Sequence, residues 1–317
     1  MISHKVLIIS GPTATGKSDI ALDIAKRVGN AEIINVDIGS FYTKATVGSA
    51  KPDYKKEIIR HHFFDVLDEP IHWTVSDFRK ELHTLLAEIW ARGNLPILVG
   101  GSAFYVQAFF YQSADIPTPA PELMQALEAQ SAQALYEQLE VIDPVRAAQL
   151  YPQDHYRLVR ALAIYHTTGK KPSEFAQTFA PLAPFEFITF VRDRAFIYEK
   201  INERTPKMFE MGWLQEVQSL QGTPWEEFLS HKLIGYQEMF LYAQHKLTQQ
   251  QAQEIIAQKT RNYAKRQLLF LKKLQATIQQ DLAAHELYKT GNCSVLQINL
   301  TLCDLGLYIN QILDRVR

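Results

Sequence analysis

The sequence has very little cysteine, almost no net charge and no long apolar run. Only two cysteines, Cys293 and Cys303, occur among its 317 residues, and neither belongs to a CxxC pair. This argues against a zinc site or a disulfide framework and is typical of two reduced, structural thiols. The formal net charge is −1, so contact with a polyanion requires a local basic patch.

Without an apolar run of membrane-spanning length, we expect no membrane segment. An apolar strand pattern begins within the first few residues, so we also expect no signal peptide. Together with the cysteine usage, this predicts a protein of the cytoplasm. Hydrophobic residues make up 47% of the chain, enough for a sizeable core in one large or two medium domains.

The most informative segment is a glycine-rich turn with the pattern G-x-x-x-x-G-K-S. It follows the apolar run 6–9 and precedes a helical pattern over 19–28. In this context it predicts a phosphate-binding loop, because its backbone N–H groups and the helix N-terminus attract an oxyanion. The predicted diphosphate- or nucleotide-binding residues are Gly11, Pro12, Thr13, Ala14, Thr15, Gly16, Lys17 and Ser18. The Ser18 hydroxyl is the predicted ligand of Mg²⁺.

Strand and helix patterns alternate over the first 112 residues. Strands are predicted over 33–36 and 95–99, and a helix is predicted to begin near Thr74, with Asp77 in capping-box position. The alternation predicts an α/β fold with a P-loop NTPase-like core, in which helices flank a parallel sheet. Ligands of such sheets bind at the carboxyl ends of the strands.

Two proline-rich segments, 116–121 and 180–184, interrupt this rhythm. We therefore interpret residues 113–184 as a helical insertion domain. Residues 1–112 and 185–317 are then the catalytic core with its C-terminal helices. A predicted helix of the insertion, from Asp154 to Thr168, carries Arg157 and Arg160, which suit phosphate contacts and surface ion pairs equally well.

A long helical pattern runs from Thr248 to about Leu274. At 100° per residue, Lys265 lies nearly opposite its apolar stripe and Arg266 flanks that stripe. Either a solvated face or a helix that faces a polyanion fits this pattern.

Polar residues follow two of the predicted strands. Asp37 could hold magnesium or accept a proton near the phosphate pocket, or it could only bond its own turn. Ser102 follows Gly100 and Gly101, where a P-loop NTPase usually has a Walker B aspartate. Its hydroxyl could donate to a departing diphosphate, or the segment could be only a tight turn.

Taken in order, these segments resemble the tRNA dimethylallyltransferase (tRNA isopentenyltransferase) family in its compact bacterial form. The resemblance rests on the phosphate-binding loop together with Val36-Asp37, Gly48-Ser49-Ala50-Lys51-Pro52, His61-His62, Leu98-Val99-Gly100-Gly101-Ser102, Arg160-Ala161-Leu162, Ile234-Gly235-Tyr236 and Ala264-Lys265-Arg266-Gln267. It covers most of the chain except the C-terminal segment.

The resemblance implies transfer of a dimethylallyl group from dimethylallyl diphosphate to N6 of an adenine. That adenine lies on the 3′ side of the anticodon in tRNAs that read codons beginning with U. Lys17, Ser18 and Mg²⁺ would stabilise the leaving diphosphate, and Asp37 would take the proton of the amine. Ser102 and Lys232 complete the implied catalytic set, and Lys232 stands where the family usually has arginine.

The resemblance also implies that the insertion and the long helix grip the anticodon stem-loop of tRNA. The implied tRNA-binding residues are Asp37, Ile38, Gly39, Ser40, Ser102, Arg157, Arg160, Lys265, Arg266 and Gln267. An adenine in a loop must leave its stack to reach such a pocket. The arrangement would work as a monomer and needs no membrane.

The chain departs from the family pattern at a few positions. Ile38 and Ser40 stand where the family commonly has serine and glutamine, and Lys232 lacks the fork of an arginine. Two alternatives therefore stay open, a catalytically inactive tRNA-binding relative and a P-loop small-molecule kinase or NTPase. The absent Walker B aspartate argues against the second.

Overall fold

A computed structural model describes residues 4–114, 116–286, 292–302 and 305–316, so Cys303 lies outside the described residues. The chain forms two compact units. The first comprises Met1–Phe110 and Pro181–Arg317, and the second is Tyr111–Ala180. The predicted division at 112/113 and 184/185 falls a few residues away. The first boundary moves because Tyr111–Gln112 (β5) pairs antiparallel with Thr178–Phe179 (β6). The second moves because the segment after β6 is bonded to the first unit, with the Leu182 N–H donating to the Phe109 carbonyl and the Val6 N–H donating to the Pro184 carbonyl.

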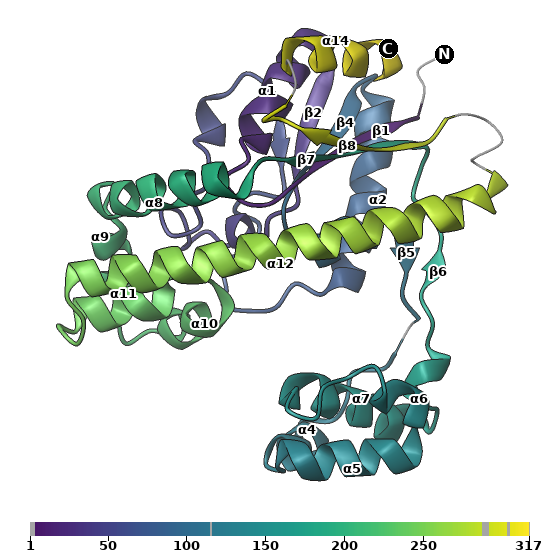
Figure 1. The fold of residues 1–317 in the computed structure, drawn as a ribbon, viewed down its shortest axis with the longest axis vertical. Helices are drawn as coiled ribbons and strands as arrows, with labels where there is room; N and C mark the ends of the chain where they lie inside the picture. The colour runs from purple at the N-terminus through teal and green to yellow at the C-terminus, as the bar shows by residue number, and fades with distance from the viewer. Residues whose placement is uncertain (1–3, 115, 287–291, 303–304, 317) are drawn as a thin grey trace. The chain divides into compact units, whose positions relative to one another are not determined.

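A six-stranded parallel sheet with the order β3-β2-β4-β1-β7-β8 forms the centre of the first unit (Figure 1). Its strands are β1 Val6–Ser10, β2 Ala31–Asn35, β3 His61–His62, β4 Leu95–Gly100, β7 Phe185–Val191 and β8 Ser294–Asn299. β1, β2, β4 and β7 are buried on both faces, as expected for a parallel sheet covered by helices. The predicted α/β fold is confirmed.

Two helices share one apolar core with the sheet. They are α1 (Lys17–Val28) and α14 (Leu305–Val316), and their residues Ile24 and Ile312 pack in one cluster with Ile9 of β1. Two further helices, α2 (Val75–Ala91) and α3 (Ala103–Phe110), pack against each other, and α2 also contacts β4. Thr74 caps α2 by accepting a hydrogen bond from the Asp77 N–H, as predicted.

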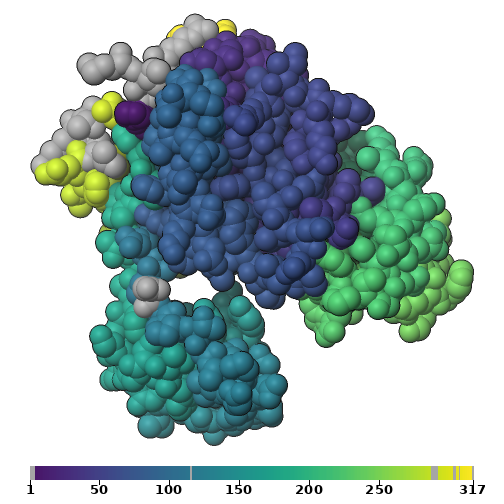
Figure 2. Space-filling view, turned by 180° about the vertical axis from the view of Figure 1, so that it is seen from behind, coloured from purple at the N-terminus to yellow at the C-terminus, as the bar shows by residue number. Residues whose placement is uncertain are grey.

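The rest of the first unit is mainly helical. Its helices are α8 Arg194–Glu210, α9 Trp213–Gln218, α10 Pro224–Lys232, α11 Tyr236–Ala243 and α12 Gln249–Ala283, and short 3₁₀ turns are η1 Ile38–Phe41 and η2 Tyr54–Lys56. α12 begins with a capping box of Thr248 and Gln251, at the predicted place. It runs past Leu274 because Ile278 and Leu282 continue its buried stripe. Seen from behind, blue residues of the N-terminal third of the chain lie beside the green residues of α9 to α11 (Figure 2), and Tyr42 packs in one cluster with Trp213 and Tyr236.

The second unit is a small helical bundle with its own core. Its elements are β5, α4 Pro121–Glu128, α5 Ala132–Ile142, α6 Pro144–Ala147, α7 His155–Thr168, η3 Pro172–Glu174 and β6. Leu139 of α5 packs with Leu158 and Leu162 of α7. Among the described residues of both units, no helix is long and apolar enough to cross a membrane.

Candidate functional site

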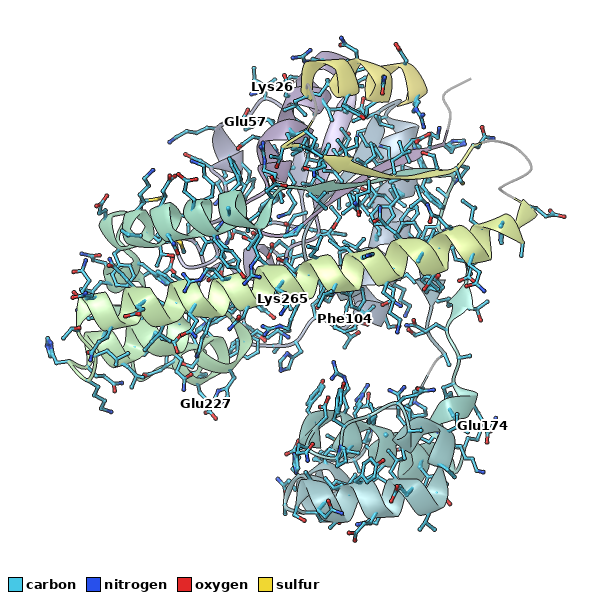
Figure 3. The ribbon with its side chains drawn as sticks, viewed as in Figure 1. Lys26, Glu57, Phe104, Glu174, Glu227 and Lys265 are labelled. Atoms are coloured by element: carbon cyan, nitrogen blue, oxygen red, sulfur yellow. The ribbon has the colours of Figure 1, made fainter. Side chains whose placement is uncertain are left out.

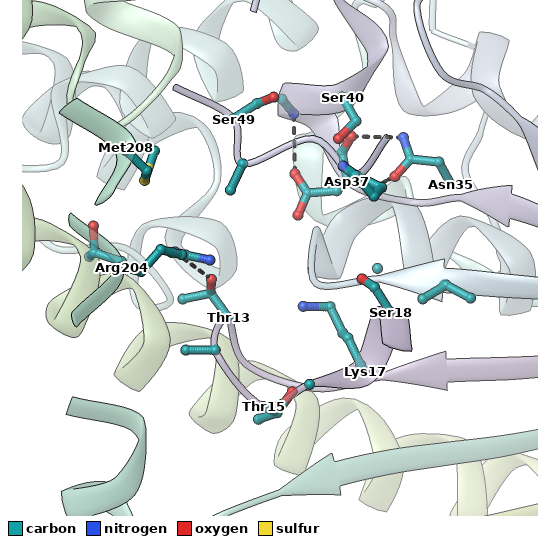
Figure 4. Close-up of a pocket in the computed structure, with 18 of the residues that line it drawn as sticks. Thr13, Thr15, Lys17, Ser18, Asn35, Asp37, Ser40, Ser49, Arg204 and Met208 are labelled. Carbon is teal, nitrogen blue, oxygen red and sulfur yellow. Dashed lines mark hydrogen bonds between the residues drawn. The ribbon is translucent and has the colours of Figure 1, made fainter. Parts of the chain in front are cut away.

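The carboxyl edge of the sheet borders a cavity of about 1080 Å³ (Figure 4). Residues 13–19 of the glycine-rich loop form one wall, and residues 35–40 after β2 form another. The segment 48–50, helix α8 and helix α12 supply the rest of the lining. The predicted phosphate-binding loop therefore lies where ligands bind in open parallel sheets.

The glycine-rich loop is held by bonds within itself before the chain enters α1. The Thr15 hydroxyl donates to the Pro12 carbonyl (2.9 Å), and Lys17 begins the helix with its side chain almost fully buried. Burial lowers the pKa of Lys17, and the nearby Asp37 carboxylate partly opposes this shift. A buried amine at a helix N-terminus is suited to bind an anion.

Asp37 faces this loop across the cavity. Its Oδ1 accepts a hydrogen bond from the Gly39 N–H (3.2 Å), so it caps η1 as well as lining the cavity. The Asn35 side chain holds the Asp37 backbone through bonds to its N–H and its carbonyl, both 3.0 Å. Both roles weighed for Asp37 from the sequence are thus compatible. Figure 4 shows its carboxylate and the Lys17 amine in the same space.

Ser102 lies behind the cavity lining and supports the wall formed by residues 35–40. Its buried hydroxyl accepts a hydrogen bond from the Ile38 N–H (3.0 Å), which ties the segment after β4 to the turn after Asp37. Gly100 permits this approach, because a Cβ there would lie 2.3 Å from the carbonyl carbon of Val36. The structure therefore places Ser102 as a support for the Asp37 turn.

In the predicted segment Ala264–Gln267 of α12, the two outer residues are buried and the two middle residues are exposed. The Gln267 side chain is buried, and its Oε1 accepts from the Thr13 N–H (2.9 Å) while its Nε2 donates to the Gly101 carbonyl (2.8 Å). Lys265 and Arg266 are exposed, and Arg266 lines the cavity. Figure 3 shows Lys265 at the surface, midway along α12. Gln267 thus fixes the glycine-rich loop, whereas Lys265 faces outward and Arg266 borders the cavity.

Lys232, at the end of α10, also lines the cavity. Its Nζ lies 2.8 Å from Nδ1 of His72. Burial lowers the pKa of Lys232, and burial together with the Lys232 charge lowers the pKa of His72. The contact therefore fits an ammonium donor and a neutral imidazole acceptor.

Arg157 and Arg160 lie on α7 of the second unit. The Arg157 guanidinium pairs with Asp154, which caps the same helix, and the Arg160 side chain is exposed. The other predicted residues, Ile38, Gly39 and Ser40, belong to η1 and line the cavity beside Asp37.

Two arginines near the glycine-rich loop were missed from the sequence. Arg204 of α8 donates to the Thr13 hydroxyl (3.1 Å), and Arg192, just before α8, donates to the Thr15 carbonyl (3.1 Å). Both line the cavity. Burial lowers the pKa of Arg204, and Asp37 opposes the shift. The spacing of Lys200, Arg204 and Lys207 on one helical face was the available signal.

The residues present fit a magnesium ion that is held mainly by a substrate. Within the described ranges, no group of three His, Cys, Asp or Glu side chains could hold a metal. Mg²⁺ commonly takes one or two protein oxygens and completes its shell with phosphate and water. The Ser18 hydroxyl and the Asp37 carboxylate, which both line the cavity, supply oxygens of this kind.

A phosphate-binding loop between β1 and α1, at the carboxyl edge of a parallel sheet, defines a P-loop type of fold. Within this class, residues 40–274 match the family model of IPP transferase. The chain is 36% identical over 275 residues to "tRNA dimethylallyltransferase 1" of Citrifermentans bemidjiense, covering 85% of this chain and 89% of that protein. The chain therefore belongs to the IPP transferase family, as its motifs predicted.

A more distant relative and two solved structures agree with this assignment. The tRNA dimethylallyltransferase of Thermotoga maritima is 32% identical over 88% of this chain and 92% of its own. The tRNA isopentenylpyrophosphate transferase of Bacillus halodurans has a TM-score of 0.64 at 29% identity, covering 98% of this chain and 95% of its own. A eukaryotic dimethylallyltransferase, described as acting on tRNA, reaches 0.75 at 27% identity, covering 96% and 75%.

Proposed function

We propose that this protein transfers a dimethylallyl group from dimethylallyl diphosphate to N6 of an adenine in tRNA. The adenine is the one on the 3′ side of the anticodon in tRNAs that read codons beginning with U. The observation that carries the proposal is the cavity in which Asp37 faces Lys17 and Arg204, in a member of the IPP transferase family.

The cations of the cavity suit the leaving group. As the bond between the allylic carbon and the diphosphate oxygen breaks, negative charge grows on the diphosphate. Lys17, Arg204 and the N–H groups at the start of α1 border the space where that charge would develop. Preorganised donors of this kind lower the barrier because they need no reorganisation during the reaction.

Asp37 suits the acceptor side of the reaction. The N6 nitrogen forms a bond to the allylic carbon, the diphosphate leaves with the electrons of the broken bond, and a proton of the amine passes to the Asp37 carboxylate. Asn35 and Ser102 hold the turn that carries this carboxylate. A base held in this way is ready for proton transfer once the adenine is in place.

Mg²⁺ is the proposed cofactor. The Ser18 hydroxyl would supply its protein oxygen, and the diphosphate and water would complete its shell. When bound, the ion would neutralise part of the charge on the diphosphate.

Two exposed basic groups are the proposed tRNA contacts. Lys265 and Arg266 belong to α12, and Arg157 and Arg160 belong to the second unit. Gln267 is proposed to act through the glycine-rich loop rather than on the RNA, because its amide is bonded within the protein at both ends. We further propose that the protein acts as a monomer in the cytoplasm.

Membership of the IPP transferase family supports prenyl transfer over the kinase or NTPase alternative. The test is to incubate the purified protein with Mg²⁺, dimethylallyl diphosphate and bacterial tRNA, and then to analyse the nucleosides by mass spectrometry. We expect an N6-prenylated adenosine that does not form when ATP replaces the prenyl donor. Salt-dependent tRNA binding without any product would instead support the inactive relative.

A further inference from the structure

A single carboxylate behind the cavity wall binds three successive backbone amides. Oε2 of Glu216, on α9, accepts hydrogen bonds from the N–H groups of Thr46 (2.9 Å) and Val47 (2.7 Å). Oε1 accepts from the Gly48 N–H (3.1 Å) and from the Tyr236 hydroxyl (2.7 Å). Consecutive amides that converge on one anion form a nest, here filled by a side chain of the protein itself.

The bonded segment is part of the cavity wall. We call residues 46–50 the cavity loop, because Gly48, Ser49 and Ala50 line the cavity. The loop also supports the turn that Asp37 caps, since a Cβ at Gly39 would lie 2.9 Å from the Ser49 Cβ. A displacement of the loop would therefore loosen the wall and the Asp37 turn together.

The cavity loop rests directly on the helices that present Glu216. A Cβ at Gly48 would lie 2.4 Å from Nε1 of Trp213 and 2.6 Å from the Tyr236 ring, so only glycine fits this approach. Trp213 and Tyr236 are both fully buried. Glu216 thus pulls the loop onto a rigid aromatic surface.

We propose that Glu216 is a positioning residue that holds the cavity loop, and through it the Asp37 turn, in place for prenyl transfer. This inference rests on the proposed function. A neutral glutamine would fit the same space, but its NH₂ group would face backbone N–H groups where a carboxylate oxygen now accepts. At least one of the three amides would lose its acceptor.

The first test measures the loop without reference to activity. In Glu216→Gln, hydrogen exchange of the amides of residues 46–48 should become at least about tenfold faster, the effect of losing a charged acceptor. Glu226→Gln is the matched control, because Glu226 also accepts a backbone N–H, but that of Gly222 (2.7 Å), which does not belong to the cavity loop. Its exchange at residues 46–48 should match that of the wild type.

The second test measures catalysis. Glu216→Gln should lower kcat at least about tenfold, while pyrophosphate binding measured by calorimetry should stay within about twofold of the wild-type value. Binding is expected to persist because Lys17 and Arg204 do not depend on the cavity loop. Glu226→Gln should keep the wild-type kcat.

Chemical rescue separates a positioning role from a general loss of folding. Formate should enter the space left in Glu216→Ala, restore slow exchange at residues 46–48 and recover part of kcat. Gly48→Ala, which pushes the loop away from Trp213 with Glu216 intact, should show the same loss of kcat.

Wild-type exchange or wild-type kcat in Glu216→Gln would overturn the proposal. So would a failure of formate to slow the exchange in folded Glu216→Ala. If Glu216→Gln does not fold, Gly48→Ala decides instead, and an unchanged kcat in that variant would overturn the proposal. If the wild type forms no prenylated adenosine, the proposed function fails, while exchange and rescue still decide whether Glu216 holds the loop.

Discussion

Three charged residues of the cavity interact with one another. Burial lowers the pKa values of Lys17 and Arg204, and Asp37 is the carboxylate that opposes both shifts. Without a ligand, the two cations thus share one anion across the cavity. A diphosphate would bring further negative charge between them, so the site suits an anionic ligand better than a neutral one.

Asp37→Asn should lower kcat by roughly 10²–10⁴-fold with little loss of stability. The amide cannot take the proton of the adenine amine, yet its oxygen can still accept from the Gly39 N–H that Asp37 now caps. Prenylated adenosine formed per minute and the thermal unfolding midpoint are the two measurements. A variant with wild-type turnover would remove Asp37 as the base.

The contact between Lys232 and His72 predicts a loss of stability in acid. The folded-state pKa of His72 is lowered, chiefly by burial, so the unfolded chain takes up this proton first as the pH falls. Stability from this group is therefore present above about pH 6.5 and is lost as the pH falls from there through the lowered pKa. The neutral ring accepts a hydrogen bond from the Lys232 ammonium, and the protonated ring would repel it.

His72→Asn should flatten this acid dependence. Urea unfolding of wild type and variant between about pH 7.5 and 5.5 checks the prediction, because other histidines contribute equally to both proteins. Parallel curves for the two proteins would contradict it.

At the scale of elements, α12 joins the glycine-rich loop to an exposed basic surface. Gln267 is the connection, since it bonds the Thr13 N–H and the Gly101 carbonyl from one amide. Its neighbour Lys265 points away into solvent. Two positions of one helix, two residues apart, can therefore be tested separately for anion binding and RNA binding.

Gln267→Leu should weaken pyrophosphate binding by about tenfold, because the half-buried Thr13 N–H loses its acceptor. Lys265→Gln should leave pyrophosphate binding unchanged and reduce the salt dependence of tRNA binding. Calorimetry and filter binding at several salt concentrations measure the two effects. Equal pyrophosphate affinity in Gln267→Leu and wild type would show that the amide does not support the loop.

The elements that carry local signals were predicted from the sequence. The capping residues Thr74 and Thr248 mark two helix starts, and β4, Leu95–Gly100, covers the predicted strand 95–99. The two-residue strand β3 and the C-terminal strand β8 were missed, because they are strands only through pairing with β2 and β7. Propensity does not encode such long-range pairing.

In the candidate site, too, residues marked by a local signal were predicted, and residues that depend on long-range contacts were missed. Lys17 and Asp37 were found because a motif and a strand end mark them in the sequence. Arg204 and Glu216 were missed because their partners, Thr13 and residues 46–48, lie far away along the chain. Ser102 was found, but its bond to the Ile38 N–H depends on how two strand ends meet.

At the scale of the whole molecule, the second unit is a separate compact body inserted into the first. Its entry and exit lie close together, since the Leu182 N–H donates to the Phe109 carbonyl (3.1 Å). The cavity lining lies entirely in the first unit. Binding of the small anion and binding of the RNA should therefore be separable.

Replacing residues 111–180 with a short glycine-serine linker should leave a folded protein that binds pyrophosphate with wild-type affinity. Its affinity for tRNA should fall, because Arg157 and Arg160 are removed with the unit. Circular dichroism, calorimetry and tRNA binding measure the three expectations. Loss of pyrophosphate binding by the folded variant would show that the second unit contributes to the site.

The size of β3 has a consequence for behaviour at high concentration. The sheet ends there in only two residues, His61 and His62, both hydrogen-bonded on the side of β2. An exposed edge strand can pair with a strand of another molecule, because its outer N–H and C=O groups are unpaired. An edge of two residues presents very few such groups. The shortness of β3 therefore protects this side of the sheet against edge-to-edge aggregation.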